Sequence, residues 1–124
     1  MKTRVLLVED HHDTRKLYDE ILTLAGFQVC GAMNRSEAMA RAGNIDVAVV
    51  DLGIPGGGYG LASALAETAN APALMVVTGR PKEEVDIIAP NLFARYLQKP
   101  VDSADLVSCV RALAEGRPRS APGV

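Results

Sequence analysis

Four short, mainly apolar segments of this sequence each run into polar residues of the kinds that bind cations or react. The segments are residues 5–8, 47–50, 74–77 and 94–98, and the polar residues that follow them are Glu9, Asp10, Asp51, Thr78 and Lys99. Segments rich in Val and Leu are typical of strands buried on both faces of a parallel sheet. Parallel strands end at one edge, where open α/β sheets bind their ligands. We therefore expect three carboxylates, a hydroxyl and an ammonium group to meet at one edge of the sheet.

The three carboxylates Glu9, Asp10 and Asp51 would crowd negative charge at that edge. Each like-charged pair about 4 Å apart costs on the order of 4 kcal/mol at an effective dielectric constant of about 20. Either one carboxylate stays protonated or a cation neutralises them. Lys99 supplies one positive charge, and a divalent ion supplies two. A small site of oxygen atoms that can keep bound waters suits Mg²⁺ or Mn²⁺.

Asp51 follows the strand expected at the centre of the sheet and is the carboxylate best placed to be approached from outside. A carboxylate held between Mg²⁺ and an ammonium group is a good phosphoryl acceptor, because both cations neutralise the transferring oxygens. Lys99 would supply the ammonium group, and Thr78 could donate a hydrogen bond to one of the same oxygens. This chemistry requires little of the protein beyond position and charge.

The segments between these strands have the spacing of amphipathic helices, so that strand and helix alternate five times. The first helix, which Asp13 would cap and Gly26 would end, is predicted to bury its apolar residues Leu17, Ile21, Leu24 and Ala25. A second strand is expected over residues 27–32. The alternation predicts an α/β fold, a flavodoxin-like doubly wound (βα)5 sheet of five parallel strands in the order 2-1-3-4-5.

The later helices have weaker boundary signals. Ser36 is predicted to cap the second helix, with Glu37 in its first turn. A glycine-rich loop from Gly53 to Gly60 precedes a third helix over residues 61–69. Pro81 would begin the fourth helix, and Asp102 or Ser103 would cap the last one, which Gly116 would end.

Length and composition indicate a single domain with an ordinary core. The 124 residues are 48% hydrophobic with 4% aromatic residues, and the net charge of −2 gives no electrostatic case for nucleic-acid binding. No apolar stretch approaches the roughly 20 residues of a membrane helix. The apolar run near the start ends at Glu9 and is too short for a signal peptide, so a cytoplasmic location is expected.

Cys30 and Cys109 are interpreted as small buried apolar side chains in a reducing compartment. We expect a domain over residues 1–116 and a flexible tail or linker stub over residues 117–124.

Four motifs together resemble the receiver domain of two-component response regulators, in a single-domain form similar to chemotaxis regulators. They are Val8-Glu9-Asp10, Asp51-Leu52-Gly53-Ile54-Pro55, Val77-Thr78-Gly79 and Tyr96-Leu97-Gln98-Lys99-Pro100. Each motif alone is a weak signal, but all four occur in order and at spacing similar to the family's. The resemblance covers residues 4–116.

The resemblance implies a role for each matching residue. Asp51 would be phosphorylated by a sensor histidine kinase or a histidine phosphotransfer protein, and Asp10 directly and Glu9 through water would hold Mg²⁺ together with the Gly53 carbonyl. Thr78 would contact the phosphoryl group and act as a switch with Tyr96. Lys99 would pair with the phosphoryl group, and the peptide bond from Lys99 to Pro100 would be cis. The resemblance further implies a monomer or weak homodimer without external substrate turnover, whose downstream partner is a protein that the sequence does not identify.

Three departures from the family pattern accompany this resemblance. The loop from Asp51 to Gly60 is one residue longer than usual, Leu92-Phe93 replaces a Gly-Ala pair, and Arg80 occupies a position that tunes dephosphorylation. We hypothesise that Arg80 shields the phosphoryl group. Two alternatives remain: a small Mg²⁺-dependent phosphatase with Asp51 as nucleophile, and a degenerate receiver that works without phosphate.

Overall fold

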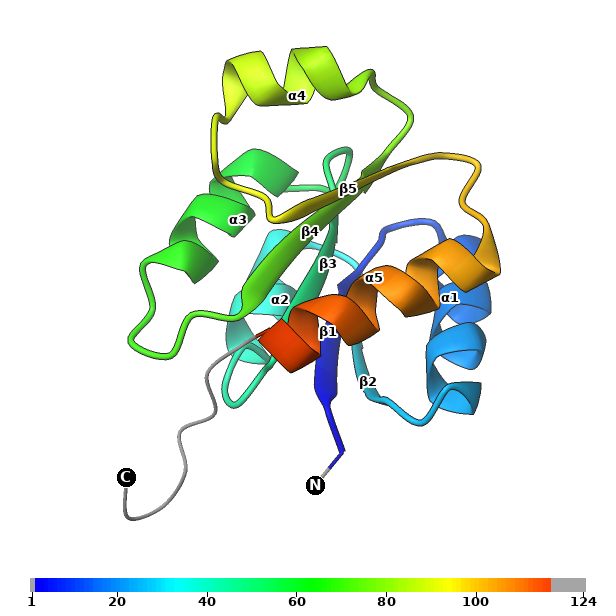
Figure 1. Cartoon of the computed structure of the whole chain (residues 1–124). Helices are drawn as coiled ribbons and strands as arrows, with labels where there is room; N and C mark the ends of the chain where they lie inside the picture. Colours follow the sequence, from blue (N-terminus) through cyan, green and yellow to red (C-terminus); the bar gives the residue numbers. More distant parts are fainter. Residues whose placement is uncertain (1, 117–124) are drawn as a thin grey trace.

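The computed structural model describes residues 2–116 as a parallel sheet between two layers of helices (Figure 1). The elements are β1 (Arg4–Val8), α1 (His12–Leu24), β2 (Gln28–Ala32), α2 (Arg35–Ala40), β3 (Val47–Asp51), α3 (Gly58–Ala66), β4 (Ala73–Thr78), α4 (Lys82–Ile88), β5 (Arg95–Gln98) and α5 (Ser103–Gly116). Within the described residues the strand order is β2-β1-β3-β4-β5, and every pairing is parallel. The predicted fold class and strand order are therefore confirmed.

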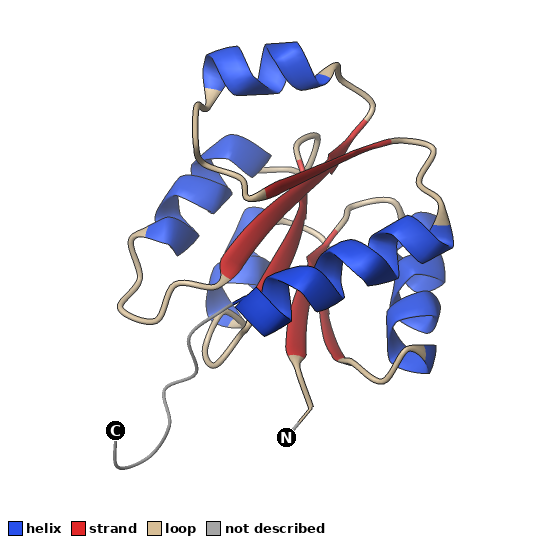
Figure 2. Cartoon of the chain, viewed as in Figure 1, coloured by secondary structure: helices blue, strands red, loops and turns tan. Residues whose placement is uncertain are grey.

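Helices cover both faces of the sheet (Figure 2). The strands alternate their side chains between two apolar clusters, one on each face. On one face, Val49 and Met75 pack with residues of α1 and α5, among them Leu106. On the other face, Val50 and Leu74 pack with residues of α2 and α3. This double burial explains why the strands are apolar at consecutive positions.

The register brings the polar strand ends together. Val8, the last residue of β1, pairs with Val50 of the neighbouring strand β3. Glu9 directly follows Val8 and Asp51 directly follows Val50, so the two carboxylate residues are neighbours. Asp51 pairs with Val77, and Thr78 pairs with Gln98. Since a parallel ladder fixes these neighbours, the candidate reactive groups lie at one edge of the sheet.

The predicted buried face of α1 was wrong for two of its four residues. Tyr18 and Leu22 are buried, whereas Leu17 is 53% and Leu24 is 89% exposed. Ile21 and Ala25 pack against the core as expected. The helix thus buries the stripe that contains the tyrosine, because that stripe faces the sheet, and it leaves a second leucine stripe in solvent.

Two predicted helix caps were wrong by two residues. The α1 cap is His11, whose Nδ1 accepts from the Thr14 backbone N–H, and the predicted cap Asp13 lies in the first turn. The α2 cap is Asn34, whose Oδ1 accepts from the Glu37 N–H at 2.8 Å, in place of Ser36. Side chains with a suitable acceptor were available earlier along the chain in both cases, so each helix begins sooner.

Other boundaries are close to their predictions. The α3 helix begins at Gly58 instead of residue 61. The β2 strand begins at Gln28, one residue later than predicted, and the preceding Phe27 is buried in the core. Of the two residues predicted to cap α5, Asp102 does so, since its Oδ1 accepts from the Ala104 N–H at 2.8 Å. Gly26 has φ +99°, the left-handed conformation expected where α1 ends.

Three further predictions concern features outside the sheet edge. Cys30 and Cys109 are free thiols, half-buried instead of fully buried. Among residues 2–116, each helix falls short of the length or apolarity needed to cross a bilayer. The predicted tail over residues 117–124 lies outside the described residues.

Candidate functional site

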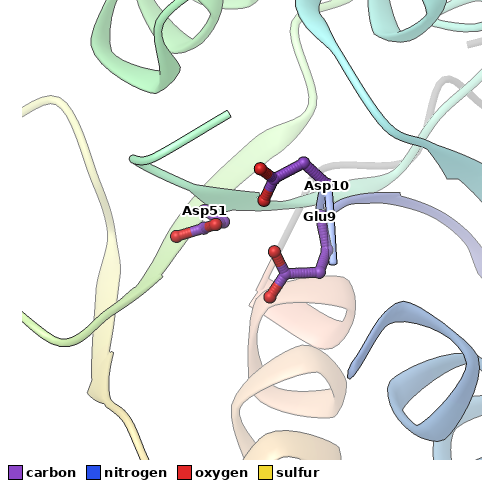
Figure 3. Close-up of side chains that lie close together, drawn as sticks. All are labelled: Glu9, Asp10 and Asp51. Atoms are coloured by element: carbon purple, nitrogen blue, oxygen red, sulfur yellow. The ribbon is translucent and has the colours of Figure 1, made fainter. Parts of the chain in front are cut away.

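The three predicted carboxylates come together at the ends of β1 and β3 (Figure 3). Glu9, Asp10 and Asp51 each offer an oxygen atom, and these oxygens lie within 4.8 Å of one another. Glu9 is buried at 2% exposure, Asp51 is partly buried, and Asp10 is exposed. The cluster therefore has one buried wall and one side open to solvent, which allows a ligand to enter.

Lys99 provides the positive charge beside these carboxylates, as the sequence predicted. Its Nζ lies 2.6 Å from Oε1 of Glu9 and 3.8 Å from Oδ1 of Asp51. The preceding strand β5 places the lysine there, and the bond to Pro100 is cis, as expected. One ammonium group thus lies beside two of the three carboxylates and cannot neutralise the charge of all three.

Burial and charge shift the pKa values of this pair. Burial is the main cause that raises the pKa of the Glu9 carboxyl; the hydrogen bond from Lys99 opposes it, and Asp51 adds to the rise. Burial lowers the pKa of the Lys99 ammonium, but the hydrogen bond to Glu9 and the charges of Asp51 and Glu9 outweigh burial, so this pKa is raised. A dication would relieve the crowding of negative charge in the cluster.

The donor set fits Mg²⁺ better than a softer metal. Carboxylate oxygens from three side chains are hard ligands, and the exposed side at Asp10 leaves room for bound waters. His11 and His12, which are exposed, do not belong to this cluster. His11 caps α1 and His12 begins it.

Thr78, Arg80 and Tyr96 form a chain of contacts next to the carboxylates. The buried Thr78 hydroxyl accepts a hydrogen bond from the Arg80 N–H at 3.2 Å, and the Tyr96 hydroxyl donates to the Arg80 carbonyl. The backbone of one residue therefore connects the two side chains that were predicted to act as a switch. Tyr96 itself is half-buried and packs against the apolar cluster of Leu52, Val76 and Val85.

The turn after β3 is held close to the strand by its glycines. The Gly53 N–H donates to Oδ1 of Asp51 at 3.4 Å. A Cβ at Gly58 would lie 2.6 Å from the Asp51 carbonyl oxygen and from Cα of Leu52, so only glycine fits there without a shift. Gly53 stays exposed beside Asp51, where its carbonyl is the predicted fourth metal ligand.

Arg80 and Arg15 make contacts that sequence reasoning did not anticipate. Arg80 pairs with Glu84 one helical turn later, at 2.8 Å, and its side chain is 61% exposed. Nη1 of Arg15 donates to the Glu9 carbonyl at 2.8 Å. No sequence signal marks this second contact, because an arginine six residues after a carbonyl reaches it only through the particular turn between β1 and α1.

Comparison with known families gives a match over nearly the whole described chain. Residues 5–111 match the family model described as the response regulator receiver domain. The transcriptional regulatory protein CpxR of Escherichia coli K12 is 31% identical over 113 residues, which cover 89% of this chain and 48% of that protein. The transcriptional regulatory protein KdpE of Staphylococcus aureus is 30% identical over 117 residues, which cover 91% of this chain and 50% of that protein. The chain therefore spans about half the length of these curated relatives.

Solved structures show the same fold. A CheY-like response regulator receiver domain from Methylobacillus flagellatus aligns with a TM-score of 0.81 at 26% identity, covering 91% of this chain and 99% of that one. A CheY-like receiver domain protein from Methanospirillum hungatei JF-1 aligns with a TM-score of 0.85 at 24% identity, covering 93% and 95%. Both comparisons agree with the predicted fold.

Proposed function

The chain belongs to the response regulator receiver domain family, and we propose that Asp51 is the residue at which it accepts a phosphoryl group. Members of this family are signalling domains of two-component systems. The observation that most supports the proposal is the meeting of Glu9, Asp10 and Asp51 oxygens within 4.8 Å, beside the Lys99 ammonium group. A set of carboxylates with one cation has no structural purpose at the edge of a sheet, because it costs stability.

The proposed transfer is a displacement at phosphorus. An Oδ atom of Asp51 attacks the phosphorus of a phosphohistidine on a sensor kinase or a histidine phosphotransfer protein. The P–N bond breaks, its electron pair stays on the imidazole nitrogen, and an aspartyl phosphate forms. Hydrolysis reverses the modification: water attacks phosphorus, the bond to the Asp51 oxygen breaks, and inorganic phosphate leaves.

Asp10, Asp51 and the Gly53 carbonyl would hold Mg²⁺, or Mn²⁺, with Glu9 acting through water. Once bound, the dication neutralises charge on the oxygens of the transferring group. Lys99 is 3.8 Å from Asp51 and would exchange its contact with Glu9 for one with the phosphoryl group. The Gly53 N–H donates to Oδ1 of Asp51 at 3.4 Å, and the other carboxylate oxygen, Oδ2, would attack phosphorus.

Thr78 and Tyr96 would pass the change to the surface. The Thr78 hydroxyl would give up its hydrogen bond with the Arg80 N–H and donate to a phosphoryl oxygen. The backbone of Arg80 would then shift and move the carbonyl to which the Tyr96 hydroxyl donates. The readout is a change in the surface formed by α4, β5 and α5. We propose that this module, over residues 1–116, acts by contact with other proteins in the cytoplasm, as a monomer or weak homodimer, and that it binds neither nucleic acid nor membrane.

The rival proposal is a small Mg²⁺-dependent phosphatase with Asp51 as nucleophile. Haloacid-dehalogenase-type phosphatases carry a second acid two residues after the nucleophile, and Gly53 occupies that position here. We therefore propose that the domain catalyses only its own phosphorylation and dephosphorylation. The complete set of carboxylates, hydroxyl and ammonium group weighs against a receiver that works without phosphate.

One experiment separates these three functions. Beryllofluoride and Mg²⁺ are added to the protein, and amide NMR shifts are recorded for wild type and for Asp51→Asn. Shifts that spread from Asp51 to Tyr96 and vanish in the variant are expected. A spectrum that beryllofluoride leaves unchanged would contradict a phosphate-dependent switch, and steady release of phosphate from small phosphomonoesters would establish the phosphatase instead.

A further inference from the structure

Arg15 contacts the peptide that joins two of the three clustered carboxylates. Its Nη1 donates to the Glu9 carbonyl oxygen at 2.8 Å, from a half-buried position in α1. That carbonyl belongs to the peptide unit between Glu9 and Asp10. The guanidinium group therefore acts on the backbone from which both side chains depart, without touching either carboxylate.

The Glu9 backbone lies just beyond the end of the β1 ladder and needs partners from elsewhere. Its N–H donates to the Ala32 carbonyl at 3.0 Å, at the end of β2. Its carbonyl receives its hydrogen bond from Arg15. Both polar groups of this residue are thus fixed, one by the neighbouring strand and one by the following helix.

The arginine stem is itself held in place. A Cβ at Gly31 in β2 would lie 3.6 Å from Cδ of Arg15, so the stem packs directly over that strand. Nη2 of Arg15 lies 3.3 Å from Nδ1 of His12. Packing on one side and a polar neighbour on the other restrict the directions in which the guanidinium group points.

Rotation of the peptide after Glu9 would move the Glu9 and Asp10 side chains relative to each other. The distance between their oxygens decides whether the two groups share one cation, since metal ligands must be placed to within a fraction of an ångström. We propose that Arg15 is a positioning residue that sets the Glu9–Asp10 peptide so that both carboxylates face one Mg²⁺. This inference rests on the proposed function, because it assumes that the cluster binds the ion.

Charge and position predict opposite effects when Arg15 is replaced. If the guanidinium group mattered only through its positive charge, its removal would tighten Mg²⁺ binding, because a nearby cation repels the dication. If it sets the peptide, its removal weakens binding, as is usual for residues that orient metal ligands. The sign of the change in affinity therefore distinguishes the two roles.

The test is a Mg²⁺ titration followed by amide NMR shifts in wild type, Arg15→Met and Arg15→Lys. The methionine keeps the apolar stem over Gly31 and loses the donor, and it is expected to raise the Kd about 3- to 10-fold. The lysine keeps one donor and is expected to bind within about 2-fold of wild type. If the methionine variant does not fold, Arg15→Leu, which also lacks a donor, takes its place with the same expected rise in Kd.

Arg41→Met is the matched control. Arg41 also donates a guanidinium hydrogen bond to a backbone carbonyl, that of Gly31, but it touches neither Glu9 nor Asp10. Its Kd is expected to equal that of wild type, and the unfolding temperature of each variant in EDTA shows whether a loss of affinity merely follows a loss of stability.

Two outcomes would overturn the inference in different ways. Unchanged or tighter Mg²⁺ binding in Arg15→Met removes the positioning role while the proposed function stands. Wild-type binding that Asp10→Asn does not weaken shows that the ion lies elsewhere, and then the proposed function fails together with the inference.

Discussion

The Nζ atom of Lys99 lies 2.6 Å from Oε1 of Glu9, although Glu9 is not the proposed phosphoryl acceptor. Asp51, the acceptor, is 3.8 Å from the same nitrogen. The ammonium group thus pairs with the most buried carboxylate, where an unpaired charge would cost most. Lys99 therefore neutralises the charge of Asp51 less than that of Glu9, and a bound dication would stabilise the Asp51 carboxylate more.

Glu9→Gln is expected to stabilise the metal-free protein. Burial raises the pKa of this carboxyl, so its ionised form is disfavoured in the folded state even with Lys99 nearby. Glutamine keeps an oxygen that accepts from Lys99 and removes one negative charge from the cluster. In EDTA at pH 7.5 the midpoint of urea unfolding should rise relative to wild type, whereas Mg²⁺ should stabilise wild type more than the variant.

Glu20→Gln is the control for this comparison, since Glu20 is exposed on α1. Its unfolding midpoint should match that of wild type both in EDTA and in Mg²⁺. A Glu9→Gln protein less stable than wild type in EDTA would show that the ion pair with Lys99 outweighs the crowding of charge.

Arg80 and Glu84 should set the lifetime of the phosphoryl group in opposite directions. Arg80 cannot shield Asp51 while its side chain pairs with Glu84 at 2.8 Å. Arg80→Ala should therefore speed hydrolysis of phosphorylated Asp51, and Glu84→Gln should slow it by freeing the arginine. Because an exposed ion pair is worth at most about 1 kcal/mol, the slowing should stay below about fivefold.

The pair of Lys82 and Asp86 on the same helix offers a matched control. These residues pair at 2.7 Å with the same spacing and comparable exposure. Asp86→Asn should leave the rate of dephosphorylation, measured by loss of the phosphorylated species over time, unchanged. Equal rates in wild type and in the Arg80 and Glu84 variants would end the shielding hypothesis.

The sequence was sufficient to predict the sheet and the residues at its edge. The short apolar segments that end in Glu9, Asp51 and Thr78 predict buried parallel strands. They also predict where these polar groups lie, because parallel strands end at the same edge of the sheet. The buried face of α1 could not be predicted in the same way, since stripes through Leu17 and through Tyr18 both have helical spacing. Only the sheet decides which stripe faces inward.

Leu22→Ala and Leu24→Ala should differ strongly although the residues are two apart on one helix. Leu22 is fully buried, and its truncation is expected to cost about 2–5 kcal/mol of the free energy of unfolding. Leu24 is 89% exposed, and its truncation should change stability by no more than about 0.5 kcal/mol. Urea unfolding of both variants measures this; similar losses would mean that α1 is rotated relative to the structure.

The thiol of Cys109 should react more slowly in the folded protein than an ordinary thiol does at the same pH. Burial is the main cause that raises its pKa; Arg95 opposes the rise and Asp105 adds to it. The folded state therefore keeps the thiol proton to higher pH than the unfolded state does, and stability falls as pH rises past the ordinary thiol pKa of about 8.5. In a Cys30→Ser background, the rate of alkylation by iodoacetamide should have its midpoint above that value and return to it in urea. A midpoint in the folded protein at the ordinary value would show that the α5 packing is looser than described.

Gly58→Ala should both destabilise the protein and weaken Mg²⁺ binding. The new Cβ would lie 2.6 Å from the Asp51 carbonyl and from Cα of Leu52, and both are backbone atoms that cannot turn aside as a side chain does. The turn that carries Asp51 must then open, at an expected cost of about 1–3 kcal/mol. Gly43→Ala is the control, because a Cβ there meets nothing within 4 Å. Urea unfolding and a Mg²⁺ titration of both variants test the claim. If Gly58→Ala has the same stability and Mg²⁺ affinity as Gly43→Ala, the turn after β3 can accommodate a Cβ without a shift.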